Sequence, residues 1–142
     1  MMTTEQFEQA LAAQIKTVRP RIEIGLDKVG ELATTMAAAY IGTYQQGWPA
    51  LAESTIKEKA AAGYAVPAPL LREGEMRDSI RHEVDPILLE LVVGSNDKTA
   101  LFQELGTVRI PPRPFLGLAL RNSLPFAEET FGKIAVKILT EK

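Results

Sequence analysis

The first third of the chain repeats apolar residues with the spacing of an α-helix. Thr4 is placed to cap its start, and Arg19-Pro20-Arg21 is expected to interrupt or kink it, because proline lacks an amide hydrogen and clashes with the preceding turn. The pattern then resumes and predicts a long amphipathic helix that ends near Gly47. Before the proline, one face collects Phe7, Ala10, Leu11, Gln14, Ile15 and Val18. After it, the stripe is Val29, Leu32, Ala33, Met36, Ala37, Tyr40, Ile41 and Tyr44.

A break at Trp48-Pro49 separates this helix from a shorter one over about Glu53 to Ala62, which Gly63 is expected to stop. Prolines hold residues 63–74 as an extended loop. The period then changes to two, which predicts an antiparallel hairpin of residues 79–84 and 87–94 around a turn at Asp85-Pro86. We expect residues 87–94 to form a buried strand.

The C-terminal third reads as helical again. Thr99 is a candidate cap for a short helical turn that Gly106 ends, and Pro125 lies near the start of the last helical segment. Its predicted inner face is Phe126, Thr130, Phe131, Ile134, Ala135 and Ile138. The order predicts an α+β fold with N-terminal helices, a small antiparallel β-sheet and a C-terminal helix packed on the sheet. We expect one domain over residues 1–142, with a helical region at 1–47 and the remainder at 48–142.

Composition narrows the function. The chain has no cysteine and one histidine, and its formal net charge of −2 leaves no basic face for nucleic acid. The N-terminus lacks the features of a secretory signal, and no apolar run approaches the ~20 residues that span a bilayer. We therefore expect a soluble protein without a metal or other cofactor.

Candidate catalytic groups are few. His82 alternates with apolar residues, which is typical of a strand face, and Glu104 near a glycine turn has no second group beside it. The acidic cluster Glu73, Glu75 and Asp78 has no histidine at ligand spacing. The sequence thus predicts a protein that is not an enzyme, and a small hydrolase using Glu104 and His82 serves only as a contrast.

A series of short motifs resembles the small head–tail joining and tail-completion proteins of tailed phages, the HK97 gp10-like family and the related Mu-type virion morphogenesis proteins. The series comprises Trp48-Pro49-Ala50-Leu51, Ser54-Thr55-Ile56, Lys59, Pro69-Leu70-Leu71, Gly74, Met76-Arg77-Asp78-Ser79-Ile80, Val93-Gly94-Ser95, Glu104-Leu105-Gly106-Thr107 and Ile110-Pro111-Pro112-Arg113-Pro114-Phe115-Leu116. It runs from about Trp48 to Leu120. Glu73 before Gly74 and Pro125 in the last helix depart from the pattern and leave the subfamily open. The resemblance implies a non-enzymatic subunit of a ring through which DNA passes.

The stretch around residues 106–115, which we call the proline corner, supplies the candidate interface. Its prolines lose little entropy on ordering against a partner, and Gly106 is expected to turn with a positive φ. Arg113 is suited to a bidentate bond with a carboxylate, from Glu104 or from the next subunit. Alternatively, the corner only connects sheet to helix and Arg113 pairs within its own chain. The candidate interface residues are Arg109, Pro111, Pro112, Arg113, Phe115, Glu104 and Trp48.

Two functions follow. The first is a virion assembly protein that forms a homo-oligomeric ring at the head–tail junction or tail end, with tail-tube, tail-terminator or neck proteins as partners and no membrane. The second is a small cytoplasmic adaptor or regulatory module that binds a single host protein. Trp48 serves either function as a partner anchor, or it is a hinge residue that closes over the core.

Overall fold

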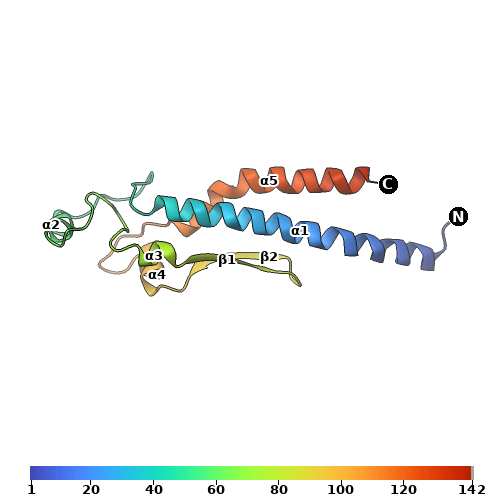
Figure 1. Ribbon diagram of the computed structural model, residues 1–142, viewed down its shortest axis with the longest axis horizontal. Coiled ribbons are helices and arrows are strands. Elements are labelled where there is room, and N and C mark those ends of the chain that lie inside the picture. The colour runs from blue at the N-terminus through green and yellow to red at the C-terminus, as the bar shows by residue number, and fades with distance from the viewer. Residues whose placement is uncertain (142) are drawn as a thin grey trace.

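The computed structural model describes residues 1–141 and shows an elongated molecule built along one long helix (Figure 1). Its elements are α1 (Thr4–Tyr40), α2 (Glu53–Ala61), α3 (Glu75–Asp78), β1 (Ile80–Asp85), β2 (Glu90–Ser95), α4 (Lys98–Leu105) and α5 (Leu116–Thr140). Helices, a two-stranded antiparallel sheet and a closing helix confirm the predicted α+β class. None of the helices within residues 1–141 is long and apolar enough to cross a membrane.

Helix α1 is continuous through Pro20, so the predicted interruption is wrong. The proline removes one backbone hydrogen bond in a turn whose outer side is open to solvent, where water can satisfy the freed carbonyl. The N-cap is Thr3 rather than Thr4. Its side chain accepts from the Gln6 amide at 3.2 Å, while the Gln6 side chain accepts from the Thr3 amide at 2.9 Å, and together these form a capping box.

The same helix ends at Tyr40, earlier than the predicted end near Gly47. Ile41 leaves the helix with an extended backbone (φ −70°, ψ 124°) and enters the core, and Gly42 follows with φ 94°. The Gly42 amide donates to the Pro69 carbonyl at 2.8 Å, which fastens the turn to the loop before α3. Tyr44 therefore fits the helical spacing of the sequence pattern but lies outside the helix.

Strands β1 and β2 form the predicted hairpin, with Val84 opposite Leu91 and His82 opposite Val93. The turn is longer than predicted, because the Asp85 carboxylate accepts from the amides of Ile87 (2.7 Å) and Leu88 (2.9 Å) and holds them out of the sheet. Both side chains are exposed, at 79% and 69%. The prediction of a buried strand over residues 87–94 is wrong: β2 begins at Glu90, its Leu91 and Val93 are only half-buried, and Val92 is exposed.

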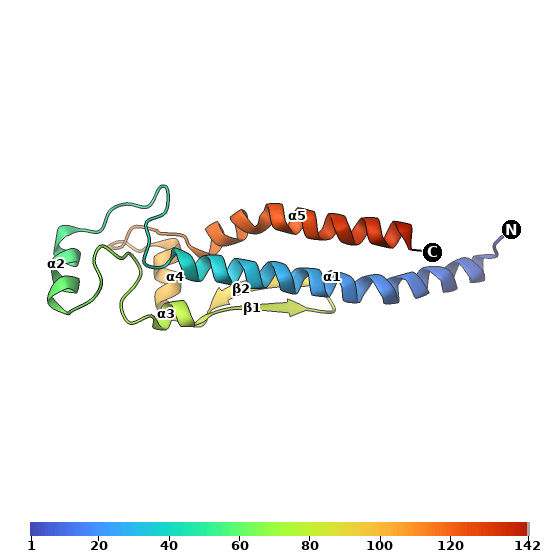
Figure 2. The same cartoon turned by 45° about the horizontal axis from the view of Figure 1, so that its top comes forward.

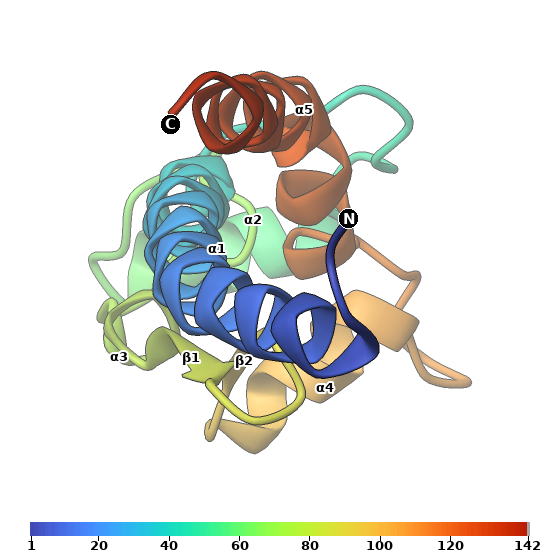
Figure 3. The same ribbon diagram turned by 90° about the vertical axis from the view of Figure 1, so that its right-hand side faces the viewer.

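Helix α1 lies between the hairpin and α5, as the end-on view shows (Figure 3). Glycines permit the close approach on both sides. A Cβ on Gly30 would lie 2.7 Å from Leu91 Cδ1, and one on Gly25 would lie 2.9 Å from both Ile134 Cδ1 and Phe131 Cε1. Real Cβ atoms are not found this close to other heavy atoms, so these two positions require glycine unless neighbouring side chains move.

Helix α5 contacts β2 near its start and runs along α1 for the rest of its length (Figure 2). It begins at Leu116, so Pro125 lies inside the helix and not near its start. Phe131, Ile134 and Ile138 are partly buried, as predicted for the inner face, whereas Phe126 and Ala135 are exposed. A helix that packs mainly against one other helix covers a narrow strip, which explains why the predicted face was too wide.

The core lies at the end of the molecule where α1 finishes and α5 begins. Its buried residues come from every element there except α2 and β2, and Trp48, Tyr40 and Leu70 pack against them. They are Ala37, Ile41, Met76, Ile80, Ala100, Phe115 and Ala119. The two long helices extend away from this core, and α2 with its loops lies beyond it at the opposite end from the N-terminus (Figure 2).

Candidate functional site

The proline corner begins where α4 ends. Asp97 caps α4 by accepting from the Thr99 amide at 2.8 Å, so Thr99 is not the cap that the sequence suggested. Gly106 stops the helix with φ 74° and ψ 171°, which confirms the predicted positive φ. A Cβ here would lie 2.8 Å from the Pro112 nitrogen and 2.9 Å from the Ile110 carbonyl oxygen. The corner folds back on its own glycine so tightly that no side chain fits.

Glu104 caps helix α5 from the outside. Its Oε2 accepts from the amides of Phe115 (2.8 Å) and Leu116 (2.9 Å), and its Oε1 accepts from the amide of Gly117 (2.8 Å). The residue at the α5 N-cap position makes no capping hydrogen bond with its own side chain. A carboxylate at this end satisfies free helix amides and faces the positive end of the helix dipole. Glu104 thus joins α4 to α5 across the whole corner.

Arg113 is buried, with 5% of its surface exposed, and it makes no bond to a carboxylate. Its Nη2 donates to the carbonyls of Pro49 (2.9 Å) and Ala50 (3.1 Å), and its Nε donates to Pro49 at 3.2 Å. The predicted pairing with Glu104 is therefore wrong, because that carboxylate is engaged by three helix amides. The structure favours the internal role for Arg113, with backbone carbonyls in place of a carboxylate.

Trp48 lies on the other side of the same junction. Its indole Nε1 donates to the Pro114 carbonyl at 3.3 Å while its ring packs against the core cluster. Arg113 and Trp48 together fasten residues 48–50 to residues 113–114 by side-chain to backbone bonds in both directions. This packing agrees with the expectation that Trp48 closes over the core. Phe115 is fully buried and anchors the corner to the core, as predicted.

The remaining candidate residues lie on the surface of the corner. Arg109, Pro111 and Pro112 are exposed, and the first two line a cavity of about 690 Å³. The predicted interface set is therefore divided. Trp48, Glu104, Arg113 and Phe115 form an internal framework, and the other three are accessible to a partner.

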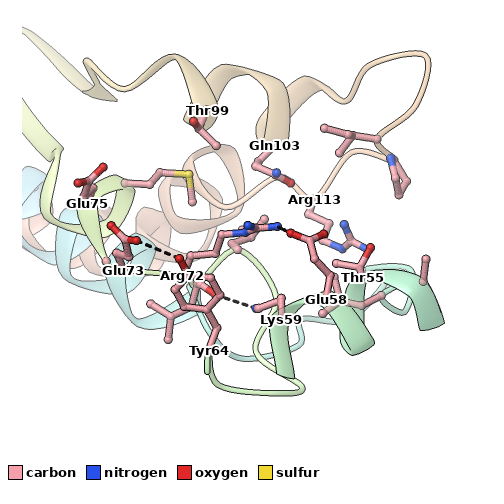
Figure 4. A pocket seen from close by; sticks show the side chains of 18 of the residues that line it. Thr55, Glu58, Lys59, Tyr64, Arg72, Glu73, Glu75, Thr99, Gln103 and Arg113 are labelled. Atoms are coloured by element: carbon pink, nitrogen blue, oxygen red, sulfur yellow. Dashed lines mark hydrogen bonds and ion pairs between the residues drawn. The ribbon is translucent and has the colours of Figure 1, made fainter. Parts of the chain in front are cut away.

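The cavity is bounded by α2, the loop of residues 63–74, α4 and the proline corner (Figure 4). Its polar side chains largely satisfy one another. Arg72 donates to Glu58 at 3.0 Å and lies 5.6 Å from the centre of the Tyr64 ring, and the Tyr64 hydroxyl donates to Glu73 at 2.9 Å. That hydrogen bond raises the pKa of Tyr64 above its ordinary value. Gln103 Oε1 is the one buried side-chain oxygen or nitrogen in residues 1–141 without a hydrogen-bond partner.

Lys59 forms the floor of this region and is 3% exposed. Its Nζ donates to the carbonyl of Leu71 at 2.7 Å and also to that of Ala68. Burial, with a smaller contribution from the nearby Arg72 guanidinium, lowers the pKa of Lys59 below its ordinary value. Lys59 belongs to the motif series, but nothing in the sequence predicts that it is buried. Its partners are backbone carbonyls of a loop, and every residue type has such a carbonyl.

The candidate catalytic residues do not come together. His82 lies on the face of β1 toward α1, where its Nε2 is 2.9 Å from Asp27 Oδ1 and its Nδ1 is 3.4 Å from Thr34 Oγ1. Both oxygens of Glu104 are engaged by α5 amides. Across residues 1–141, no group of three histidine or acidic side chains is arranged to hold a metal ion.

Comparison of the chain with protein-family models, with curated proteins and with solved structures found no significant match in any of the three.

Proposed function

We propose that this chain is a structural subunit of a tailed-phage or prophage virion, which assembles as a homo-oligomeric ring at the head–tail junction or tail end. In this role it has no catalytic activity and needs no cofactor. Its partners are copies of itself and the tail-tube, tail-terminator or neck proteins. DNA passes through the ring without sequence-specific binding.

The observation that carries the proposal is how the phage-like motifs meet in space. The W-P-A segment at residue 48 is more than 50 residues away in sequence from the E-x-G-T segment at residue 104 and the P-P-R-P-F segment at residue 111. They are joined by the bonds of Arg113 to Pro49 and Ala50, of Trp48 to Pro114, and of Glu104 to the start of α5. Scattered coincidental matches have no reason to converge in this way. The resemblance therefore coincides with one structural unit.

The architecture also suits a ring subunit. A subunit that repeats around a ring needs a rigid core and accessible apolar surfaces at fixed angles to it. The corner supplies rigidity through proline, the Gly106 turn and buried side-chain bonds. Large apolar side chains remain exposed on α1, α4 and α5, among them Leu11 (50%), Leu105 (70%) and Leu139 (85%).

The test is complementation of a phage or prophage from which this gene has been deleted. The expected phenotype is full heads and finished-looking tails that remain unjoined, or tails with abnormal ends, seen by electron microscopy and restored by the gene supplied in trans. Light scattering on the purified protein should show a closed oligomer, alone or with its tail or neck partner. Normal plaques without the gene would eliminate the virion-assembly function.

The adaptor function remains the alternative, and the 690 Å³ cavity is the observation that favours it. A chain that stays monomeric with phage proteins, and that retains one bacterial protein in stoichiometric amounts through the cavity, would establish the adaptor instead. Arg109→Glu is the informative variant, because this exposed residue lines the cavity.

A further inference from the structure

The N-terminal end of α1 projects beyond the hairpin and beyond the end of α5 (Figure 1). Arg19 donates to the carbonyls of Pro86 (3.0 Å) and Ile87 (2.6 Å) at the tip of the hairpin, and Arg21 pairs with Glu141 at the end of α5. The hairpin therefore ends near Arg19, whereas the end of α5 reaches further and borders a shallow hollow with Ala10, Ala13, Gln14 and Thr17 of α1. Residues 1–17 are all exposed, and the side view shows the start of α1 beyond the C-terminal end of α5 (Figure 1).

The projecting segment carries an apolar stripe, which we call the α1 stripe: Phe7, Leu11 and Ile15, exposed at 57%, 50% and 48%. Their spacing of four continues the stripe that is buried further along the same helix at Val29, Ala33 and Ala37. Most of the stability of a helix in a protein comes from packing of its apolar face. A regular core-like stripe on such a segment indicates that something covers it.

A second exposed apolar surface lies at the other end of the molecule. Leu101, Phe102 and Leu105 share the outer side of α4, and Val108 follows it, with exposures of 58%, 47%, 70% and 106%. We call these four residues the α4 patch. The opposite side of α4 is buried through Ala100, which packs in the core with Ala37 and Ile41. The inner side of this short helix therefore has packing partners within residues 1–141, and its apolar outer side is exposed.

The two surfaces have complementary charges. Glu5 and Glu8 flank the start of the α1 stripe, and Glu8 shares a face with Leu11 three residues on. Lys98 shares a face with Leu101 and Phe102, and Arg109 follows Val108. None of these four charged side chains forms an ion pair in the part of the chain that the structure describes. Such an arrangement steers one surface onto the other.

The two surfaces of one molecule cannot meet. Leu11 and Ala37, which lies near α4, are about 40 Å apart along a continuous helix at about 1.5 Å per residue. Two different, complementary surfaces at opposite ends of a subunit make a head-to-tail contact, which closes into a ring when the rotation between copies allows it. We propose that the α1 stripe of one copy docks on the α4 patch of the next. This contact rests on the proposed ring and specifies its interface.

Sedimentation velocity over a concentration series tests the contact on the full chain. Leu11→Lys and Leu105→Lys should each raise the dissociation constant for self-association at least tenfold. Val136→Lys, a matched change of an exposed α5 residue (61%) outside both surfaces, should change it less than threefold. An equimolar mixture of Leu11→Lys and Leu105→Lys should form dimers and nothing larger, because only one intact contact remains.

Cross-linking gives a second readout that needs only transient association. The chain contains no cysteine, so single cysteines report without background. A short bismaleimide should join Leu11→Cys chains to Leu105→Cys chains in a mixture, and much less within either protein alone. Gly132→Cys is the control, since this helical position on α5 has open space around it.

Several outcomes would overturn the contact. One is wild-type protein that sediments as a monomer with no cross-link between positions 11 and 105. Another is an oligomer that survives both lysine substitutions, which would leave the ring in place but move its interface elsewhere. Loss of binding to a tail or neck protein, with self-association unchanged, would assign the α1 stripe to that protein. Normal plaques without the gene would refute the virion function while leaving a measured contact intact.

Discussion

Replacing Glu104 by alanine should destabilise the fold more than any other change to an exposed or half-exposed acidic residue of this chain. The variant removes the acceptor for three amides at the start of α5. Phe115 is fully buried, and the bond to Leu116 is partly buried, so water cannot replace both bonds. The amide of Gly117 is exposed and can bind water instead.

The magnitude follows from these environments. Loss of a helix N-cap costs about 1 kcal/mol, and a buried donor left without a partner costs ~1–3 kcal/mol. Together they give a decrease of about 2–4 kcal/mol in the free energy of unfolding. For a domain of this size that is a melting temperature lower by about 10 °C. Glu104→Gln should fall between wild type and Glu104→Ala, because it keeps one acceptor oxygen but loses the charge.

The assay is equilibrium unfolding in urea, followed by circular dichroism and repeated as a thermal melt. Glu58→Ala is the matched control, because that glutamate forms an exposed ion pair with Arg72 (61% and 52% exposed) of a kind that contributes at most ~1 kcal/mol. A Glu104→Ala protein within ~0.5 kcal/mol of wild type, the usual range of surface substitutions, would refute the capping argument.

Four further predictions use the same melts. Arg113→Glu should lower the free energy of unfolding by several kcal/mol, because it buries a carboxylate against the backbone carbonyls that now accept from the guanidinium. A variant as stable as wild type would refute this internal role. Gly106→Ala should cost at least ~1–3 kcal/mol, since its φ and ψ lie in a region nearly exclusive to glycine, and an unchanged melting temperature would contradict that backbone. The pKa of Lys59 is lower in the folded than in the unfolded state. The stability of wild type relative to Lys59→Met should therefore increase as the pH rises from the folded-state pKa towards the unfolded value of ~10.4. A stability difference that does not change with pH would argue against burial of the ammonium group. Leu91→Asp should lower stability by ~2 kcal/mol or more, whereas Val92→Asp on the exposed face (58%) should change it by under ~0.5 kcal/mol; equal effects would contradict the strand's orientation.

Local signals in the sequence were sufficient for much of the fold. Period-two alternation located the hairpin, and glycine located the turn after α2 and the turn after α4. Boundaries failed where a tertiary contact overruled the pattern. Tyr44 fits the helical spacing, yet α1 stops at Tyr40 because Ile41 is drawn into the core and Gly42 bonds to Pro69. A contact with a residue 27 positions further on has no local signature.

The candidate site shows a different limit. Glu104 and Arg113 have opposite charges and lie close in sequence, so their pairing was a reasonable prediction. Each instead satisfies backbone groups: Glu104 accepts from free helix amides, and Arg113 donates to carbonyls of residues 49 and 50. Where backbone polar groups are buried, they compete with charged side chains for partners. A sequence states which side chains are charged, but it does not state which backbone groups lack a partner.

Stability and the α1 side of the proposed contact are separable in this molecule because they depend on opposite ends of it. The bonds of Glu104, Arg113 and Trp48 all lie at the core end, so changes there act first on the free energy of unfolding. The side chains of the α1 stripe are about half exposed and belong to no buried cluster of residues 1–141. A substitution such as Leu11→Lys therefore removes little that holds the monomer together. If Leu11→Lys abolishes assembly at an unchanged melting temperature while Glu104→Ala does the reverse, the corner is the scaffold and the projecting helix is the connector. Parallel effects of the two changes would mean that folding and association are one process, in which the monomer has no stable fold of its own.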